Sequence, residues 1–449
     1  MPHARWLVPL LAGAVTAAIA ASPPSPPAAG GSDTERHGPY ATRGLCDGFP
    51  RAALTAPAGW CVGVVADASS GLRFPRRVLE VAPGRLWIVD MGSWEPRQGR
   101  LLELAWPDPT RSSAAGRGER PRATVLASGL DRPLALVRGP DDKVWIGEAG
   151  RVARTPVGPP GAPVRLETVV DGLPADGAHP LKELAFGRDG TLYLNVGSAS
   201  DACRDAASPQ RPPPLPCPEA GGERPRAAVW AATFERPAWT LRALRPFATG
   251  LRNSVALAVV PGTDRLLQGE NSIDWPDAAE PPEELNALRE GAFHGWPYCV
   301  GDRRPARGYE GRFDCAGRSA APAMRWPAHA APLQMQAFAA DAPHAFTGQL
   351  VVAFHGYRGD GHRLVSFPLG KDGTASGPAR EWIAGWDALA GVRPLGTPTG
   401  FTVDRAGRML VVEDRNRTLL VLAREAGTTG ASGTRGASGA GGTATGAGR

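Results

Sequence analysis

Short apolar segments recur along the chain in pairs, and each pair is joined by a turn that contains glycine or aspartate. Two apolar runs separated by such a turn are typical of a β-hairpin. The fifth of the six copies is the least regular. The copies are 78–83 with 86–89, 134–137 with 144–147, 184–186 with 192–196, 255–260 with 266–269, 335–339 with 350–354, and 401–403 with 409–412.

A further apolar strand follows five of these hairpins. The strands are 100–105, 151–156, 227–234, 363–368 and 418–422. A hairpin with an outer strand, repeated at intervals of tens of residues, is typical of a propeller blade. The pattern therefore predicts an all-β chain folded as a six-bladed β-propeller, with long loops inserted at 198–226 and 271–332.

One segment of the second insert has the features of a short helix. In Pro281–Arg289, prolines precede the acidic Glu283 and Glu284, and Leu285 and Leu288 fall on one helical face. Proline and acidic residues are favoured in the first turn of a helix, so the sequence predicts a helix in this loop.

The two ends of the chain differ in composition from its centre. Residues 1–20 join the basic Arg5 to an apolar run that ends in Ala18-Ile19-Ala20, as in a secretory signal peptide. A retained N-terminal anchor is the alternative. We expect a linker at 21–38, the propeller at 39–424 and a disordered tail rich in Gly, Ala, Thr and Ser at 425–449. The predicted location is periplasmic or secreted, without a membrane span after cleavage.

The six cysteines form three local pairs, two of them inside the long inserts. An exported protein meets an oxidising compartment in which disulfides persist. Proximity predicts disulfides that staple these loops, although six cysteines allow fifteen connectivities. The predicted pairs are Cys46–Cys61, Cys203–Cys217 and Cys299–Cys315.

Charge excludes one class of partner. The chain has 50 basic and 44 acidic residues, a net charge of +6, and no long basic run. Neither a basic stripe nor a nucleic-acid-binding motif is present, so we expect no nucleic-acid partner.

Candidate chemistry lies where the chain enters the inner strands, because these strands line the channel of a propeller. His179 precedes the third inner strand, Arg252 and Asn253 precede the fourth, and His355 ends the fifth hairpin. A neutral imidazole can act as a general base, and a guanidinium can bind an anionic ligand. The alternatives are a hydrogen-bonded loop histidine and a surface ion pair. Asp90, Trp94 and Trp296 are further candidates for the channel mouth, or else structural residues.

These residues lie in runs that resemble the glucose/sorbosone dehydrogenase family, and in particular its sorbosone-dehydrogenase branch. The resemblance covers roughly residues 79–422 and implies a six-bladed propeller that uses pyrroloquinoline quinone (PQQ) and calcium. The runs are His179–Asp201, Gly250–Asn253, Gly269–Asn271, Glu283–Asn286, Gly295–Pro297 and Phe354–Gly356.

The resemblance also implies roles for individual residues. His179 matches the base that takes a hydroxyl proton while hydride passes to the quinone, and Arg252 and Asn253 match residues that contact the cofactor. Calcium would be bound partly by backbone carbonyl groups, the oxygen ligands that this ion prefers. The stretch that matches these ligands is Glu270, Asn271 and Ser272.

The chain departs from the family pattern at three places. Ser198 stands where an aspartate orients the base, and His355 stands where a lysine binds the cofactor carboxylates. Thr397 and Thr399 stand where arginines are expected, and the cations that could compensate are Arg358 and Arg393. Because charged donors bind carboxylates most strongly, fewer of them predict weaker cofactor binding.

The sequence thus predicts a quinoprotein oxidoreductase that oxidises a sugar, either an aldose or a sugar aldehyde such as sorbosone, and passes electrons to an external acceptor. One alternative is a non-catalytic propeller that has lost PQQ and serves as a binding module. The other is a calcium-dependent lactonase-type hydrolase, whose metal would need converging carboxylates. The candidates for that set are Glu148, Glu270 and Glu413.

Overall fold

The computed structural model describes residues 35–106, 121–204, 211–356, 361–386 and 396–425. They all belong to one compact unit, residues 35–449. The predicted signal peptide, nearly all of the predicted tail, Arg358 and Arg393 lie outside the described residues.

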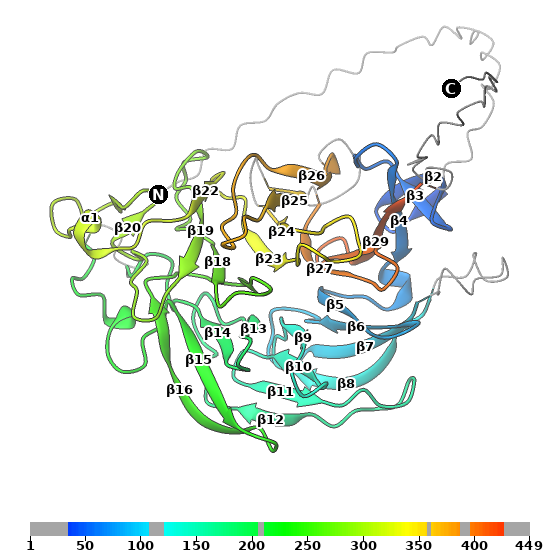
Figure 1. Ribbon diagram of the computed structural model, residues 1–449, viewed down its shortest axis with the longest axis horizontal. Coiled ribbons are helices and arrows are strands. Elements are labelled where there is room, and N and C mark those ends of the chain that lie inside the picture. The colour runs from blue at the N-terminus through cyan, green and yellow to red at the C-terminus, as the bar shows by residue number, and fades with distance from the viewer. Residues whose placement is uncertain (1–34, 107–120, 205–210, 357–360, 387–395, 426–449) are drawn as a thin grey trace, which may run out of the picture. The chain divides into compact units, whose positions relative to one another are not determined.

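The described chain is a six-bladed β-propeller, as predicted, and each blade contains a four-stranded antiparallel array (Figure 1). The first three blades are β5 (Pro75–Ala82), β6 (Arg85–Asp90), β7 (Gly99–Ala105) and β8 (Thr124–Leu130); β9 (Leu136–Arg138), β10 (Val144–Gly147), β11 (Val152–Thr155) and β12 (Glu167–Val170); and β13 (Leu184–Phe186), β14 (Leu192–Val196), β15 (Ala228–Glu235) and β16 (Thr240–Thr249).

The other three blades follow in chain order. They are β17 (Ala256–Val259), β18 (Leu266–Glu270), β19 (Glu283–Leu288) and β22 (Met324–Trp326); β23 (Pro332–Ala337), β24 (Gln349–Phe354), β25 (Arg363–Pro368) and β26 (Arg380–Ile383); and β27 (Pro398–Val403), β28 (Met409–Glu413), β29 (Thr418–Arg424) and β4 (Trp60–Ala66).

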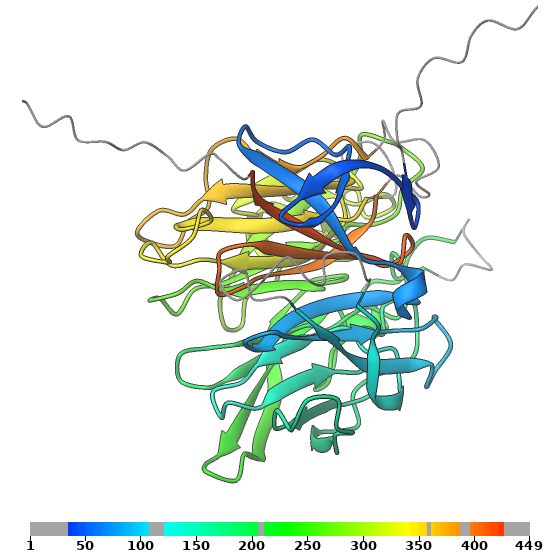
Figure 2. The same cartoon turned by 90° about the vertical axis from the view of Figure 1, so that its right-hand side faces the viewer.

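The last blade closes the ring, because its outermost strand comes from the N-terminal part of the chain. Strand β4 pairs with β29 in antiparallel register, with Val62 opposite Leu422. The sheet continues through β3 (Phe49–Ala52), β2 (Tyr40–Cys46) and β1 (Glu35–His37), of which β1 lies within the expected linker. Figure 2 shows these blue strands beside the red β29.

The hairpins are strongly apolar because each blade of the closed ring packs against a neighbour on both faces. In β6 the five residues from Leu86 to Asp90 are all buried. Trp145 of the second blade, for example, packs with Leu184 and Trp230 of the third in one buried cluster. A strand buried on both faces reads as a continuous apolar run rather than an alternating one.

One arginine occupies the axis of the propeller. Arg77 of β5 is 1% exposed, and its guanidinium forms an ion pair with Glu183, which precedes β13. It also donates to the backbone carbonyl groups of Val255, Leu333 and Thr399. These partners belong to the third, fourth, fifth and sixth blades, so one side chain links five blades at their inner strands.

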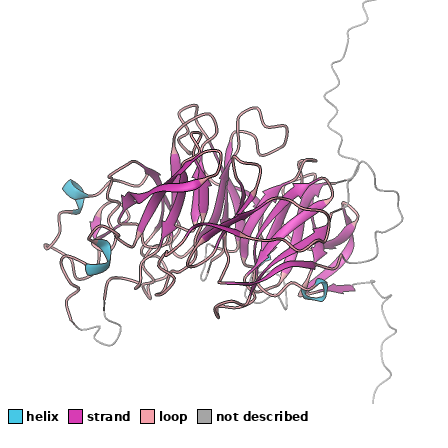
Figure 3. Cartoon of the chain, turned by 90° about the horizontal axis from the view of Figure 1, so that it is seen from below, coloured by secondary structure: helices cyan, strands magenta, loops and turns pink. Residues whose placement is uncertain are grey.

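The predicted helix at residues 281–289 is wrong. Residues 283–288 form β19, which pairs with β18 on one edge and β22 on the other. Glu283 accepts the backbone N–H of Ser272, and Glu284 accepts that of Gly301. The two acids therefore bind neighbouring loops instead of forming a first helical turn. The described helices are short: η1 (Ala68–Ser70), η2 (Pro218–Ala220) and α1 (Cys315–Arg318) (Figure 3).

The three predicted disulfides are confirmed as Cys46–Cys61, Cys203–Cys217 and Cys299–Cys315. The first joins β2 to β4. The other two lie in the inserts and share a buried cluster, which includes the short strand β20 (Cys299–Val300) and lies beside β21 (Arg304–Pro305). Among the described residues, no helix is both long and apolar enough to span a membrane.

Candidate functional site at the channel mouth

His179 lies against the end of β14 because two glycines allow the backbones to approach closely. Ala178 donates its N–H to the Ala199 carbonyl at 2.8 Å. A Cβ at Gly197 would lie 2.5 Å from the Cβ of His179, and a Cβ at Gly177 would lie 2.6 Å from the Cα of Ala199. Neither distance is tolerated between carbon atoms, so both positions need glycine.

The hydrogen bonds of His179 fix which ring nitrogen carries the proton. Nδ1 lies 2.9 Å from Ser198 Oγ and 3.1 Å from the Ser198 carbonyl oxygen. The Ser198 hydroxyl donates its single proton to the Ser200 carbonyl at 2.6 Å, so its oxygen must accept from His179. Nδ1 therefore carries the hydrogen, and Nε2 keeps its lone pair. Among the described residues, Nε2 has no hydrogen-bond partner.

Burial keeps this imidazole neutral. Burial first, and then the positive charge of nearby Arg252, lower the pKa of His179 to about 3. A neutral imidazole with an available Nε2 can accept a proton from a hydroxyl group, as a general base does. Because Ser198 contributes no negative charge, the base is weaker than one oriented by a carboxylate.

Arg252 is buried, and its guanidinium is shared between two carboxylates. It lies 2.6 Å from Asp201 Oδ1 and 2.7 Å from Asp274 Oδ2, and it donates to the Asn271 carbonyl at 3.0 Å. Its positive charge is therefore largely compensated within the protein. The neighbouring Asn253 side chain is partly exposed, and its amide has no partner within the described part of the chain.

His355 belongs to a second buried ion cluster. Its Nε2 lies 3.2 Å from Asp414 Oδ1, and Arg76 Nη1 lies 2.6 Å from Asp414 Oδ2. Burial acts to raise the pKa of Asp414, but His355 and Arg76 outweigh it and lower that pKa to about 2. Sequence reasoning missed Arg76 and Asp414. The only signal was the presence of charged residues inside an otherwise apolar inner hairpin.

Thr397 and Thr399 are fully buried at the start of β27. Thr399 Oγ1 lies 3.1 Å from the Pro75 carbonyl and 3.2 Å from that of Val412. Thr397 Oγ1 is buried without a partner among the described atoms. Neither hydroxyl supplies the charge that an arginine would supply at these positions.

The acids at the mouth serve as structural caps. In four blades, a carboxylate at or just after the end of the second strand accepts a backbone N–H from the chain entering the inner strand. These four carboxylates and their donors are Asp90 with Phe74 (3.0 Å), Glu148 with Asp131 (2.8 Å), Glu270 with Arg252 (2.6 Å) and Glu413 with Thr397 (3.2 Å). In the third blade, the side-chain amide oxygen of Asn195 accepts the backbone N–H of Glu183 at 2.6 Å in a similar way.

These caps bear on the lactonase-type alternative. Glu148 also binds Arg151, and Glu413 also accepts from Tyr40, Asn416 and Thr418. Burial, followed by the negative charge of Glu284, raises the pKa of Glu270 well above its usual range. Carboxylates that are committed to backbone and side-chain donors do not form a converging ligand set.

The stretch predicted to bind calcium is held by internal contacts. The Asn271 carbonyl accepts from Arg252, and its side-chain amide donates to the Pro332 carbonyl at 2.8 Å. Ser272 donates its hydroxyl to the Pro282 carbonyl at 2.6 Å. The role of Glu270, Asn271 and Ser272 in binding calcium stays a prediction. The one three-residue group of ligand side chains in the described chain contains the bonded Cys203 and Cys217, with Glu219.

The aromatic candidates separate into two kinds. Trp296 is 3% exposed and donates its indole N–H to the Asp201 carbonyl at 2.9 Å, so it supports the insert that holds Arg252. Trp94 is 51% exposed in the loop after β6. Asp90, the third candidate, is fully buried as a cap.

Comparison with known proteins supports the resemblance. The family model of glucose/sorbosone dehydrogenases matches residues 161–356, which include His179, Arg252, Asn253 and His355. No curated protein matches the chain.

Several solved structures are similar in fold. The PQQ domain of a pyranose dehydrogenase from Coprinopsis cinerea is 17% identical, with a TM-score of 0.62 over 84% of this chain and 98% of that one. The calcium structure of a Trichoderma reesei carbohydrate-active enzyme of family AA12 is 20% identical, with a TM-score of 0.59 over 83% and 97%. The PQQ-bound aldose sugar dehydrogenase of Streptomyces coelicolor is 18% identical, with a TM-score of 0.52 over 83% and 100%.

At these identities the solved structures show the shared propeller fold, and the family match carries the class of activity. The predicted resemblance to glucose/sorbosone dehydrogenases and the predicted oxidoreductase class are confirmed. The match does not single out the sorbosone branch.

Proposed function

We propose that the chain is an exported quinoprotein dehydrogenase that oxidises a hydroxyl group of a sugar, with His179 as the general base. The observation that carries the proposal is the state of this side chain. His179 is neutral, its Nδ1–H is bound by Ser198, and its Nε2 is available at the channel mouth. An aldehyde substrate such as sorbosone would present the same hydroxyl chemistry through its hydrate.

The residues at the mouth fit the reactive side of PQQ. The Arg252 carbonyl accepts the backbone N–H of Ser198, the residue that binds His179 Nδ1, and the Arg252 charge acts on the imidazole. The Asn253 amide follows Arg252 directly in the chain and would be a donor for a quinone carbonyl. PQQ, when bound, would accept the hydride of the sugar. Its carboxylates would be held by Arg252, Arg76 and His355, each of which already has an aspartate as partner. We therefore expect weak cofactor binding.

His179 would take the hydroxyl proton at Nε2 as the hydride leaves the carbon that carries this hydroxyl group. The new imidazolium would be stabilised at Nδ1–H by the Ser198 carbonyl and hydroxyl oxygens. Nearby Arg252 opposes this positive charge, so the proton would pass readily to solvent after turnover. The protein thus supplies a positioned acceptor for the proton.

The proposal also includes calcium, export and an electron acceptor. Calcium would bind carbonyl oxygens of Glu270 and Ser272, and the Asn271 carbonyl would have to release Arg252 to join them. The three disulfides suit an exported protein, in agreement with the proposed signal peptide and a periplasmic or secreted location. Electrons would leave to an external acceptor.

A binding module without PQQ is the second candidate. It is favoured by the pairing of Arg76, Arg252 and His355 with aspartates and by the uncharged Thr397 and Thr399. Calorimetric titration of the full chain with PQQ in calcium buffer separates the two candidates. Saturable binding supports the dehydrogenase, whereas no binding at millimolar concentrations supports the module.

The catalytic test uses the loaded chain, a reducible dye and a panel of aldoses. His179→Asn keeps an N–H donor toward Ser198 but removes the Nε2 acceptor. We expect this variant to bind PQQ as the wild type does and to lose dye reduction by about 100-fold or more, the usual contribution of a general base. Turnover equal to that of the wild type would exclude His179 as the base.

A further inference from the structure

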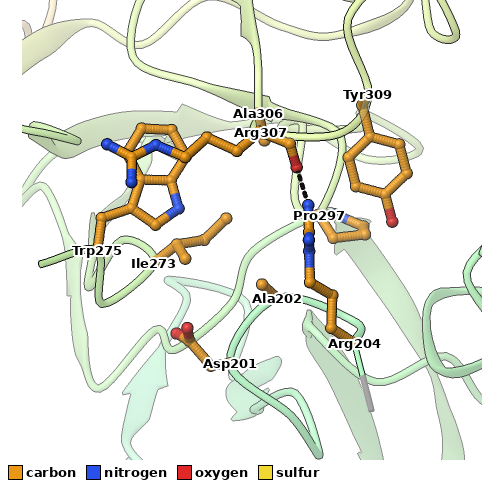
Figure 4. Close-up of a pocket in the computed structure, with 9 residues that line it drawn as sticks. All are labelled: Asp201, Ala202, Arg204, Ile273, Trp275, Pro297, Ala306, Arg307 and Tyr309. Atoms are coloured by element: carbon orange, nitrogen blue, oxygen red, sulfur yellow. Dashed lines mark hydrogen bonds between the residues drawn. The ribbon is translucent and has the colours of Figure 1, made fainter. Parts of the chain in front are cut away.

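A hollow lies between the two disulfide-stapled inserts, beside the Arg252 site (Figure 4). Its volume is about 200 Å³, and its lining is both apolar and charged. It is lined by Asp201, Ala202, Arg204, Ile273, Trp275, Pro297, Ala306, Arg307 and Tyr309.

The hollow shares a wall with the network that holds His179. The Ser198 hydroxyl donates to the carbonyl of Ser200, and the next residue, Asp201, lines the hollow. The Asp201 carboxylate binds Arg252 and accepts the backbone N–H of Asp274 at 3.0 Å. The hollow therefore shares Asp201 with the candidate site, and the chain leads from Asp201 directly to Ser198, which binds the proposed base.

The lining combines flat apolar surfaces with planar hydrogen-bonding groups. Trp275 and Ile273 form one side, and Pro297 and Arg204 form the opposite side (Figure 4). The Arg307 guanidinium lies 4.2 Å from the centre of the Trp275 ring, and Asp201 points toward the space between the sides. Apolar walls with a few placed polar groups are typical of small-molecule sites.

Arg204 is the cation of this group whose charge is least compensated. Its guanidinium donates to the Arg307 carbonyl, and it has no carboxylate partner within the described chain. Arg252, by contrast, pairs with two aspartates. Arg204 thus retains N–H donors for a ligand that carries hydroxyl oxygens.

The hollow is built on loops that are tied together. Tyr309 donates its hydroxyl to the Pro214 carbonyl at 3.1 Å, and the Tyr298 hydroxyl accepts the backbone N–H of Cys217 at 2.8 Å. Each loop is closed by its own disulfide, Cys203–Cys217 or Cys299–Cys315. A site fixed before binding does not have to be ordered by its ligand.

We propose that this hollow is a saccharide subsite that binds one sugar ring next to the ring presented to His179. C–H groups of the ring would pack on Trp275, and its hydroxyl groups would bind Asp201, Arg204 and Arg307. Drug-sized ligands need roughly 300–1,000 Å³, so a hollow of about 200 Å³ takes a single ring. The substrate is then an oligosaccharide or a glycan end of two or more rings. The position of the oxidised ring rests on the proposed function; binding in the hollow does not.

A second hollow carries no comparable argument. It is lined by Ala279, Glu280, Pro282, Arg304 and Arg325. Arg304 pairs with Glu280 and Arg325 pairs with Asp302, and all four side chains are substantially exposed. It has no aromatic wall among these residues.

The test measures binding and kinetics separately. The full chain, without added cofactor, is applied to a printed array of mono- and oligosaccharides of one to six rings. We expect retention of at least one oligosaccharide of two or more rings, and a loss of about tenfold in affinity, or 1.4 kcal/mol, in Trp275→Ala and in Arg204→Ala. Trp275→Phe should retain most of the affinity, and Arg245→Ala, which changes an exposed arginine on β16, should behave as the wild type.

The kinetic arm compares a monosaccharide with the oligosaccharide that contains it, using the loaded chain. We expect Trp275→Ala to lower kcat/KM about tenfold for the oligosaccharide and to leave it unchanged for the monosaccharide. The subsite would be overturned if the wild type retained no oligosaccharide on the array. It would also be overturned if Trp275→Ala lowered kcat/KM equally for the monosaccharide and the oligosaccharide. A third outcome separates the two proposals. If the wild type retains an oligosaccharide, the variants lose it, and the loaded wild type reduces no dye, the subsite is supported and the dehydrogenase is contradicted.

Discussion

Replacing the axial Arg77 should destabilise the whole propeller. Arg77→Met leaves the Glu183 carboxylate buried without its cation and removes the donor from carbonyl groups of three other blades. Removing one partner of a buried ion pair costs about 3–5 kcal/mol. Each carbonyl left without a donor costs about 1 kcal/mol or more unless water reaches it.

A loss of at least about 4 kcal/mol is expected, which is a large part of the roughly 5–15 kcal/mol that stabilises a typical domain. Urea unfolding, followed by tryptophan fluorescence, measures it. The double variant Arg77→Met with Glu183→Leu removes both charges, so it should recover at least half of the loss. A change of less than about 1 kcal/mol in Arg77→Met would refute the idea that this side chain joins the inner strands.

Three further changes test the surroundings of His179. Ser198→Asp places a carboxylate at the Nδ1–H of His179 and should raise the pKa of His179 above about 3. The acid limb of the profile of kcat/KM against pH should therefore move to higher pH. An unmoved limb would contradict the role of His179 as general base. Gly197→Ala brings a Cβ to 2.5 Å from the His179 Cβ and should lower turnover by about tenfold or more without loss of secondary structure in circular dichroism. Lys182 has a pKa lowered to about 7 by burial, against 10.5 in the unfolded chain, so the native state binds fewer protons and stability should rise from pH 7 toward pH 10. Urea midpoints at pH 7 and pH 9 should show this rise in the wild type, and Lys182→Met should lack it.

The fold was predictable because the inner hairpins are buried on both faces. Burial of this kind produces the apolar runs around Leu86 and Leu192, and the turns between strands carry glycine or aspartate. The third strand of the fourth blade was missed because Glu283 and Glu284 suggested a helix start. Their burial as caps depends on loops at Ser272 and Gly301, which local sequence does not reveal.

The sequence predicted individual residues of the site at the channel mouth, but not the partners that hold them. His179 and Arg252 were found from their places before inner strands, and the structure adds their partners. Asp201 lies 51 positions from Arg252 in the chain, and Asp414 lies 59 from His355, so neither pairing has a local signature. Arg77 was overlooked since an arginine inside a strand reads as a surface residue unless its buried acid is known.

Anaerobic mixing of the PQQ-loaded chain with sugar, without any dye, tests the central claim most directly. The absorbance of the bound quinone reports its reduction in a single turnover. We predict one equivalent of quinone reduced in the wild type and, over the same time, no measurable reduction in His179→Asn. A quinone that binds saturably but stays oxidised with every aldose, sugar aldehyde and oligosaccharide offered would contradict the account.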